Sequence, residues 1–141
     1  MRSVSLGLIV CFGVLGAARA QDDAAKKELD KLQGKWKAEK FVVMGEEVPA
    51  AALAMMSLTC KGSELIPSDN PDDPATIKLD PAAKPKTIDL TEKSKKVSLG
   101  IYELDGDNLK LCFAEPGTDR PKTFESPKGS KIAYVVLKRE K

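Results

Sequence analysis

The side chains that most often perform catalysis or bind metals are sparse in this chain. The sequence contains no histidine, which excludes Ser-His-Asp and Cys-His nucleophile systems and every imidazole metal site. Catalysis would therefore depend on carboxylates, Lys or Tyr, and no spacing singles out a general acid/base pair. We expect no catalytic residue and no cofactor, and a carboxylate-based hydrolase ranks third among the hypotheses for function.

One acidic, proline-rich segment contains clustered oxygen ligands of the kind that calcium prefers, namely Asp69, Asn70, Asp72 and Asp73. Pro71 and Pro74 interrupt the alternation that an EF-hand loop requires. The composition is equally typical of a solvated loop, and we favour that interpretation. We therefore predict no metal site.

The N-terminus has the pattern of a secretory signal peptide. A basic start precedes an apolar run from Leu6 to Leu15, which is shorter than the roughly 20 residues of a membrane span. Ala18-Arg19-Ala20 matches the small-x-small cleavage pattern, so we expect cleavage after Ala20, export to the periplasm or cell exterior, and no membrane span after processing. A retained anchor is the alternative. We expect no lipid anchor at Cys11, because apolar residues continue past it.

In the rest of the chain, residues 21–141, charge restricts the possible partners and length restricts the number of domains. Loss of Arg2 and Arg19 lowers Lys+Arg from 23 to 21, against 21 Asp+Glu, so the processed chain is formally neutral. Neutral composition with mixed signs argues against nucleic-acid binding, which needs a clustered basic face. A chain of this length forms one domain with one core.

Hydrophobic patterns predict one helix and about eight strands. Ala25, Leu29 and Leu32 recur at helical spacing, which predicts a helix over 23–33 that ends at Gly34. Residues 49–56 are ambiguous between a helical turn and a loop. Short segments separated by turn residues predict strands over 35–43, 57–60, 64–66, 75–79, 87–90, 97–104, 109–114 and 132–138, with a brief one at 122–124. Eight antiparallel strands predict a small all-β barrel.

The strongest turn signal lies at residues 105–108, Asp-Gly-Asp-Asn. A two-residue turn there pairs Leu104 with Leu109, Tyr102 with Leu111, and Gly100 with Phe113, all on one face. Gly100 leaves space for the Phe113 ring. The other face holds Ile101, Glu103, Lys110 and Cys112, which we predict to point outward.

The same strand parity bears on the two cysteines of the processed chain. Cys112 falls on the outer face of its strand, whereas Cys60 shares the inner face with Leu58. A disulfide needs Cα atoms within about 7 Å and converging side chains, which opposite faces of a wall rarely provide. We therefore predict that Cys60 and Cys112 stay free.

The chain resembles a family of uncharacterised, lipocalin-like secreted domains that is abundant in planctomycete bacteria. The matching stretches cover 32–37, 84–90, 99–107, 109–114, 116–117, 120–121 and 136–139, nearly the whole processed chain. The chain departs from the family at Cys60, where an aromatic residue is more frequent, and in the loop 69–74. The resemblance implies a lipocalin-like barrel and no activity.

Gly34-x-Trp36 resembles the opening signature of lipocalins, in which a Trp closes one end of the barrel and an Arg of the last strand lies over its ring. The resemblance implies that Arg139 has this role, because Ala133, Val135, Leu137 and Arg139 share a face of the last strand. We interpret Gly34, Trp36 and Arg139 as a structural barrel end.

Two further hypotheses for function remain, and both are non-enzymatic. The first is an extracytoplasmic domain that binds a small apolar ligand inside the barrel, with Tyr102, Leu111 and Phe113 as ligand-binding candidates. This hypothesis is motivated by a predicted apolar interior of Leu58, Ile77, Leu79, Ile88, Leu90, Leu104, Leu109, Leu111 and Phe113. The second is a structural or protein-interaction module with a filled interior that acts through an outer stripe of Ile132, Tyr134 and Val136. An interior cavity of roughly 300 Å³ or more would favour the first.

Overall fold

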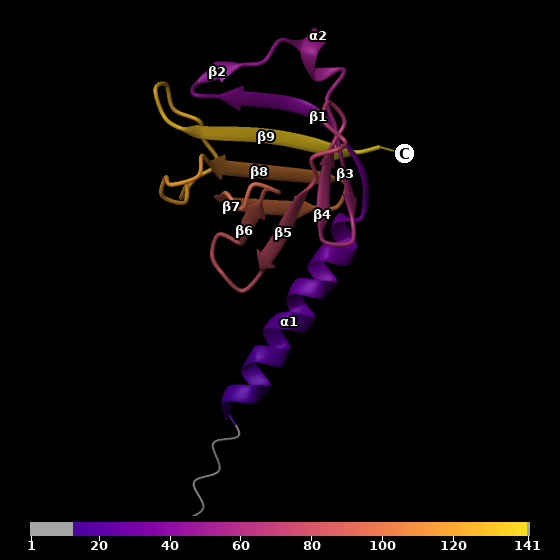
Figure 1. Cartoon of the computed structure of the whole chain (residues 1–141), viewed down its shortest axis with the longest axis vertical. Coiled ribbons are helices and arrows are strands. Elements are labelled where there is room, and N and C mark those ends of the chain that lie inside the picture. Colours follow the sequence, from indigo (N-terminus) through magenta and orange to yellow (C-terminus); the bar gives the residue numbers. More distant parts are fainter. Residues whose placement is uncertain (1–12, 141) are drawn as a thin grey trace, which may run out of the picture.

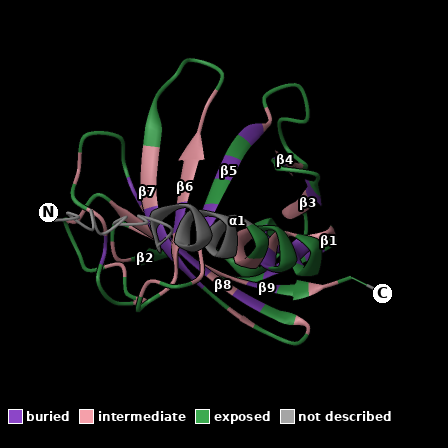
Figure 2. Cartoon of the chain, turned by 90° about the horizontal axis from the view of Figure 1, so that it is seen from below, coloured by how far each residue is buried: buried purple, intermediate pink, exposed green. Residues whose placement is uncertain are grey.

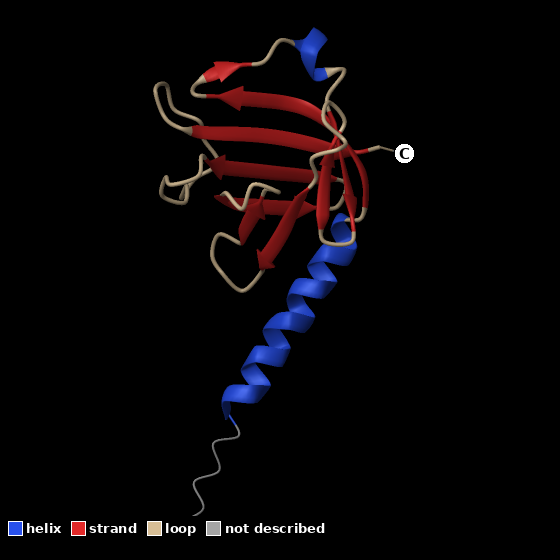
Figure 3. Cartoon of the chain, viewed as in Figure 1, coloured by secondary structure: helices blue, strands red, loops and turns tan. Residues whose placement is uncertain are grey.

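A computed structural model describes residues 13–140, and for residues 13–22 it describes the backbone alone. The described residues form two helices and nine strands, most of them short (Figures 1 and 3). In chain order they are α1 (Gly13–Leu32), β1 (Gly34–Val43), β2 (Glu46–Glu47), α2 (Ala50–Leu53), β3 (Ser57–Lys61), β4 (Glu64–Pro67), β5 (Ala75–Asp80), β6 (Thr87–Thr91), β7 (Val97–Asp105), β8 (Asn108–Ala114) and β9 (Ile132–Arg139).

Eight of the strands close into an antiparallel barrel. The strands β1 and β3 to β9 follow one another around the sheet, and β9 pairs back onto β1. β1 takes part in both pairings because its first residues pair with β3 while most of its length pairs with β9. The short strand β2 adds to the far end of β1. This confirms the predicted all-β barrel of eight strands with an N-terminal helix; β2 was not predicted.

Alternation along the strands separates a buried interior from an exposed surface. In β5, Ala75, Ile77 and Leu79 are buried and the residues between them are not. The inward residues form one cluster that contains the whole predicted interior, which is Leu58, Ile77, Leu79, Ile88, Leu90, Leu104, Leu109, Leu111 and Phe113. Period-two patterning therefore located the interior of the barrel correctly.

The hairpin of β7 and β8 has the predicted register. Leu104 lies opposite Leu109, Tyr102 opposite Leu111, and Gly100 opposite Phe113. A Cβ atom added to Gly100 would lie 2.6 Å from Cδ1 of Phe113, so the ring occupies the space that a side chain would take. A larger residue at position 100 would displace the Phe113 ring.

Helix α1 begins at Gly13, ten residues before the predicted start, and ends at Leu32. Its C-terminal part lies across one end of the barrel (Figure 2), with Glu28 and Leu32 buried and Leu29 packed against the core. The predicted signal peptide lies partly outside the described residues, and the predicted cleavage point after Ala20 falls within the helix. Cys11 also lies outside the described residues.

The loop between β8 and β9 covers part of the outer wall. Ile101 and Cys112 lie outside the interior cluster, on the outer face that their parity predicts, yet both are buried. The Cys112 thiol lies 3.5 Å from the carbonyl oxygens of Thr123 and Glu125. Small hydrophobic clusters of this kind, beneath long loops, commonly accompany the main core of a domain.

The same loop also contacts the outer stripe predicted on β9. The Phe124 and Tyr134 rings pack with centroids 6.3 Å apart, and Ser126 donates a hydrogen bond to the Ile132 carbonyl. The stripe is therefore half-buried under this loop, and α1 lies elsewhere, at the barrel end. Residues 122–124 form bends and no strand, because their backbone lies over the wall without pairing to a strand of the sheet.

Arg120 anchors the loop to the barrel. Its guanidinium donates hydrogen bonds to the Gly100 carbonyl oxygen at 2.7 Å and to the Asp89 carboxylate at 2.7 Å. One side chain thus connects the loop to both β6 and β7. Hydrogen bonds that involve a charged partner contribute about 1.5–3 kcal/mol each where they are shielded from water, and less where they are partly exposed as here.

We expect Arg120→Ala to loosen the loop and to expose Cys112 without opening the barrel. Native-state titration with a thiol reagent should show Cys112 reacting at least tenfold faster in the variant, while Cys60 stays slow in both proteins. Titration of the wild-type protein that lacks residues 1–20 under denaturing, non-reducing conditions should find both thiols. An intramolecular crosslink between Cys60 and Cys112 would contradict the face assignment, and an unchanged Cys112 rate would contradict the anchoring role of Arg120.

Candidate functional site

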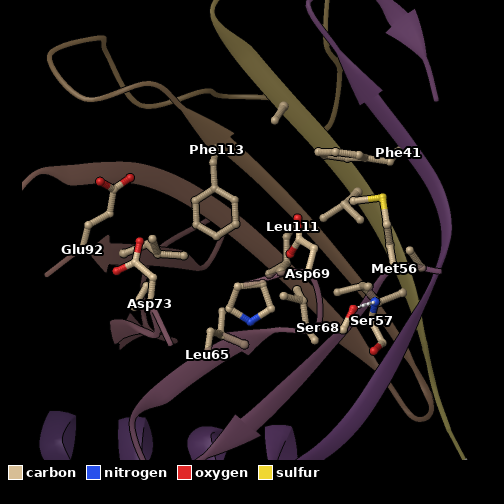
Figure 4. Close-up of a pocket in the computed structure, with 18 residues that line it drawn as sticks. Phe41, Met56, Ser57, Leu65, Ser68, Asp69, Asp73, Glu92, Leu111 and Phe113 are labelled. Atoms are coloured by element: carbon tan, nitrogen blue, oxygen red, sulfur yellow. Dashed lines mark hydrogen bonds between the residues drawn. The ribbon is translucent and has the colours of Figure 1, made fainter. Parts of the chain in front are cut away.

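The half of the barrel away from α1 contains an apolar cavity of about 320 Å³. Its walls come from seven of the eight barrel strands, and aliphatic and aromatic side chains dominate them (Figure 4). The lining residues are Ala38, Phe41, Met56, Ser57, Leu58, Leu65, Pro67, Ser68, Asp69, Asp73, Ala75, Leu90, Glu92, Leu111, Phe113, Ala133, Val135 and Leu137. Residues at the open end of this set, such as Ser68 and Asp69, are exposed, so the cavity reaches solvent.

The mouth of the cavity is polar and acidic. Asp69 and Asp73 come from the loop after β4, and Glu92 directly follows β6. Ser68 completes this edge: its hydroxyl donates to the Met55 carbonyl at 3.2 Å and accepts from the Ser57 amide at 2.9 Å. In residues 23–140 no group of three or more acidic or thiol side chains has the arrangement of a metal site.

The other half of the barrel is filled and closed by aromatic packing. Trp36 is fully buried, and its indole N–H donates to the Leu32 carbonyl oxygen at 2.8 Å. The Arg139 guanidinium carbon lies 4.3 Å from the centroid of the indole. A guanidinium over an indole contributes about 0.5–2 kcal/mol, more where water is excluded. The geometry is the barrel end that we predicted for Gly34, Trp36 and Arg139.

Arg139 also terminates α1. It donates hydrogen bonds to the carbonyl oxygens of Lys31 and of Gln33, the latter at 2.6 Å, and its Nε lies 3.4 Å from the Asp107 carboxylate. A helix C-terminus leaves carbonyl groups unpaired and has a partial negative charge. A cationic donor there forms hydrogen bonds with the carbonyl groups and offsets the charge. Gly34 has a φ of +116°, which favours glycine where the chain turns from α1 into β1.

Tyr102 belongs to this closed end and does not line the cavity. Its hydroxyl donates to the Glu28 carboxylate of α1 at 3.0 Å, and the Lys86 ammonium lies 3.3 Å from the same carboxylate oxygen. Tyr102 was predicted to orient a ligand inside the barrel. Tyr102 faces inward as predicted. Its hydroxyl, however, binds Glu28 at the closed end of the barrel and does not point into the cavity.

Glu28 is charged although only 8% of its surface is exposed. Burial by itself raises the pKa of this carboxyl, but hydrogen bonds from Tyr102 and Lys86 and the charges of Lys86 and Lys31 outweigh it and hold the pKa below its usual value. Burial, together with the Glu28 charge, raises the pKa of Tyr102 well above its ordinary value. At physiological pH Glu28 is therefore ionised and Tyr102 is neutral.

Both cysteines of the described chain are free and lie on opposite faces of the wall. Cys60 belongs to the interior cluster, where burial raises its thiol pKa to about 11. Burial also raises the pKa of Cys112 beneath the loop. A thiol that is protonated and buried is a poor nucleophile, so neither position has the environment of a reactive cysteine.

The structure brings together two of the three ligand-binding candidates. Leu111 and Phe113 line the cavity, whereas Tyr102 lies at the closed end. Our sequence analysis missed Glu28, although an acid three residues after Ala25 and one before Leu29 interrupts the apolar stripe of the helix and is a detectable signal. It also missed Glu92 at the mouth and placed Asp69 and Asp73 in solvent only.

Comparisons with known proteins return no match. No family model, curated protein or solved structure is similar to this chain at a significant level. The resemblance to lipocalin-like secreted domains therefore stays a prediction, and the fold is described from the structure alone. Within residues 13–140, no helix combines the length and hydrophobicity that crossing a bilayer requires.

We expect Arg139→Met to destabilise the protein more than Arg139→Lys, because Lys keeps a cation near Trp36 and the helix end while Met keeps only the apolar stem. The expected losses in the free energy of unfolding are about 2–4 kcal/mol for Met and about 1–2 kcal/mol for Lys. Urea unfolding followed by Trp36 fluorescence measures both. Equal losses would show that the charge has no role here.

Glu28→Gln is expected to lower the free energy of unfolding by about 1–2 kcal/mol at pH 7. Because the folded pKa of Glu28 is depressed, its contribution is complete above the ordinary value of 4.5 and disappears as pH falls through the folded value. The difference between wild type and variant in urea unfolding should therefore shrink between pH 6 and pH 3. A difference that is the same at every pH would contradict an ionised Glu28.

Proposed function

We propose that the processed protein is a non-enzymatic, extracytoplasmic binding domain that holds a small apolar ligand in the open half of its barrel. The observation that carries this proposal is the 320 Å³ cavity, lined by apolar side chains from strands β1, β3 to β6, β8 and β9. Small-molecule sites are typically concave, mostly apolar and largely formed before the ligand arrives. A filled structural module has no need of such a space.

The division of the barrel into two halves supports this role. The closed half contains two stabilising contacts, Trp36 with Arg139 and Tyr102 with Glu28, while the open half keeps apolar side chains around an unfilled space. Burying apolar surface contributes about 25 cal/mol per Å², so apolar walls left open to water forgo this gain. A ligand that fills the space would recover it.

The volume restricts the ligand to a small molecule. Liquid water occupies about 30 Å³ per molecule, so 320 Å³ has room for roughly ten non-hydrogen atoms. Among the lining residues, Leu111 and Leu137 are buried, whereas Asp69 and Asp73 are exposed. A single medium-length alkyl chain or one ring with a short substituent fits this space.

We expect Ala133→Trp and Leu111→Trp to lower the affinity for alkyl ligands at least tenfold by filling the cavity. Both residues line it, so an indole at either position occupies ligand volume. The measurement is a panel of medium-chain alcohols and small aromatic compounds, read by thermal shift and native mass spectrometry on the protein that lacks residues 1–20.

Lys138→Trp is the matched control, since it adds the same indole on the exposed outer face of β9. Binding should be unchanged in this variant. Tyr102→Phe should also keep its affinity, because Tyr102 does not line the cavity. If no panel member binds the wild type, or if filled variants bind as well as the control, the ligand hypothesis fails and an outer-surface interaction module replaces it.

A further inference from the structure

We propose that the ligand is an aliphatic amine, whose alkyl chain occupies the cavity and whose ammonium group lies at the acidic mouth. This inference rests on the proposed binding function and adds the chemical class of the ligand. The observations behind it are the sign of the charges at the mouth, the absence of an ion pair with any of them among the described residues, and the apolar space behind them.

The charged residues that line the cavity all have the same sign. Asp69, Asp73 and Glu92 are acidic, and the lining contains no Lys or Arg (Figure 4). They come from two segments of the chain, the loop after β4 and the residue that follows β6. Negative charges beside a low-dielectric cavity concentrate a field that favours a cation.

None of the three carboxylates is neutralised by a nearby side chain. Within the part of the chain that the structure describes, none of them lies within 4.0 Å of a Lys or Arg nitrogen. Lys93 directly follows Glu92, yet its ammonium donates to the Asp72 carbonyl oxygen and it does not line the cavity. Glu92 accepts a hydrogen bond from the Ser94 hydroxyl at 3.2 Å. The mouth thus keeps its negative charge.

An amine of medium chain length satisfies both parts of the site. The cavity has room for roughly ten non-hydrogen atoms, which corresponds to a chain of about eight to ten carbons. An alkyl ammonium group resembles that of lysine, with a pKa near 10.4, and is therefore charged at neutral pH. A carboxylate head group on an alkyl chain of the same length would instead lie beside three groups of like charge.

The test compares three ligands with the same chain, namely decylamine, 1-decanol and decanoate, by calorimetry and native mass spectrometry at pH 7. We expect decylamine to bind about tenfold more tightly than decanol, and decanoate to bind most weakly. Because the carboxylates are partly exposed, added salt should reduce the advantage of the amine. The triple variant Asp69→Asn/Asp73→Asn/Glu92→Gln should bind amine and alcohol equally.

The control variant removes three exposed carboxylates elsewhere, Asp30→Asn/Glu39→Gln/Asp105→Asn, and has the same net charge as the mouth variant. It should keep the preference for the amine. If decanol binds but decylamine binds no better, the amine proposal fails while the binding function stands. If neither ligand binds, the proposed function itself fails. A preference that survives neutralisation of the mouth would place the ammonium elsewhere and overturn the proposal.

Discussion

The contact between Arg139 and Trp36 joins the first strand, the last strand and the helix at one end of the barrel. The guanidinium covers the indole, and the same group binds the carbonyl oxygens at the end of α1. The Trp36 indole N–H donates a hydrogen bond to the Leu32 carbonyl oxygen at the end of α1. Barrel closure requires β9 to reach β1, and Arg139 pairs opposite Trp36 in that register. The same side chains therefore contribute both to barrel closure and to helix docking.

This concentration of contacts explains how the barrel tolerates an open half. Buried hydrogen bonds and close packing stabilise the end that α1 covers, where Glu28, Tyr102 and Lys86 add a charged cluster with every member paired. Buried charges are costly unless they are paired in this way. The opposite end has no comparable cluster among the described residues and holds the cavity. The stabilising contacts and the cavity are therefore separated along the barrel axis.

The outer wall of the barrel also contains buried apolar side chains, which add to the core of this small domain. The loop from β8 to β9 uses Arg120 as its anchor and covers Ile101 and Cys112, which the strands direct away from the barrel. A chain of this size gains stability from any additional buried apolar area. The loop thus acts as a partial second layer, and a hydrophobic outer stripe on β9 is covered by the chain itself, at least in part.

The sequence by itself determined the barrel, the register of the hairpin of β7 and β8, and the interior, because period-two alternation and turn chemistry are local properties. The pairing of Tyr102 with Leu111 and the space at Gly100 follow from one turn. Tertiary structure decided what the strands meet beyond their neighbours: which residue of α1 binds the Tyr102 hydroxyl, which loop covers Cys112, and that Asp69 and Asp73 lie at the mouth of a cavity. Those contacts join segments far apart in the chain, and their geometry depends on the twist and tilt of the closed barrel, which no local pattern encodes.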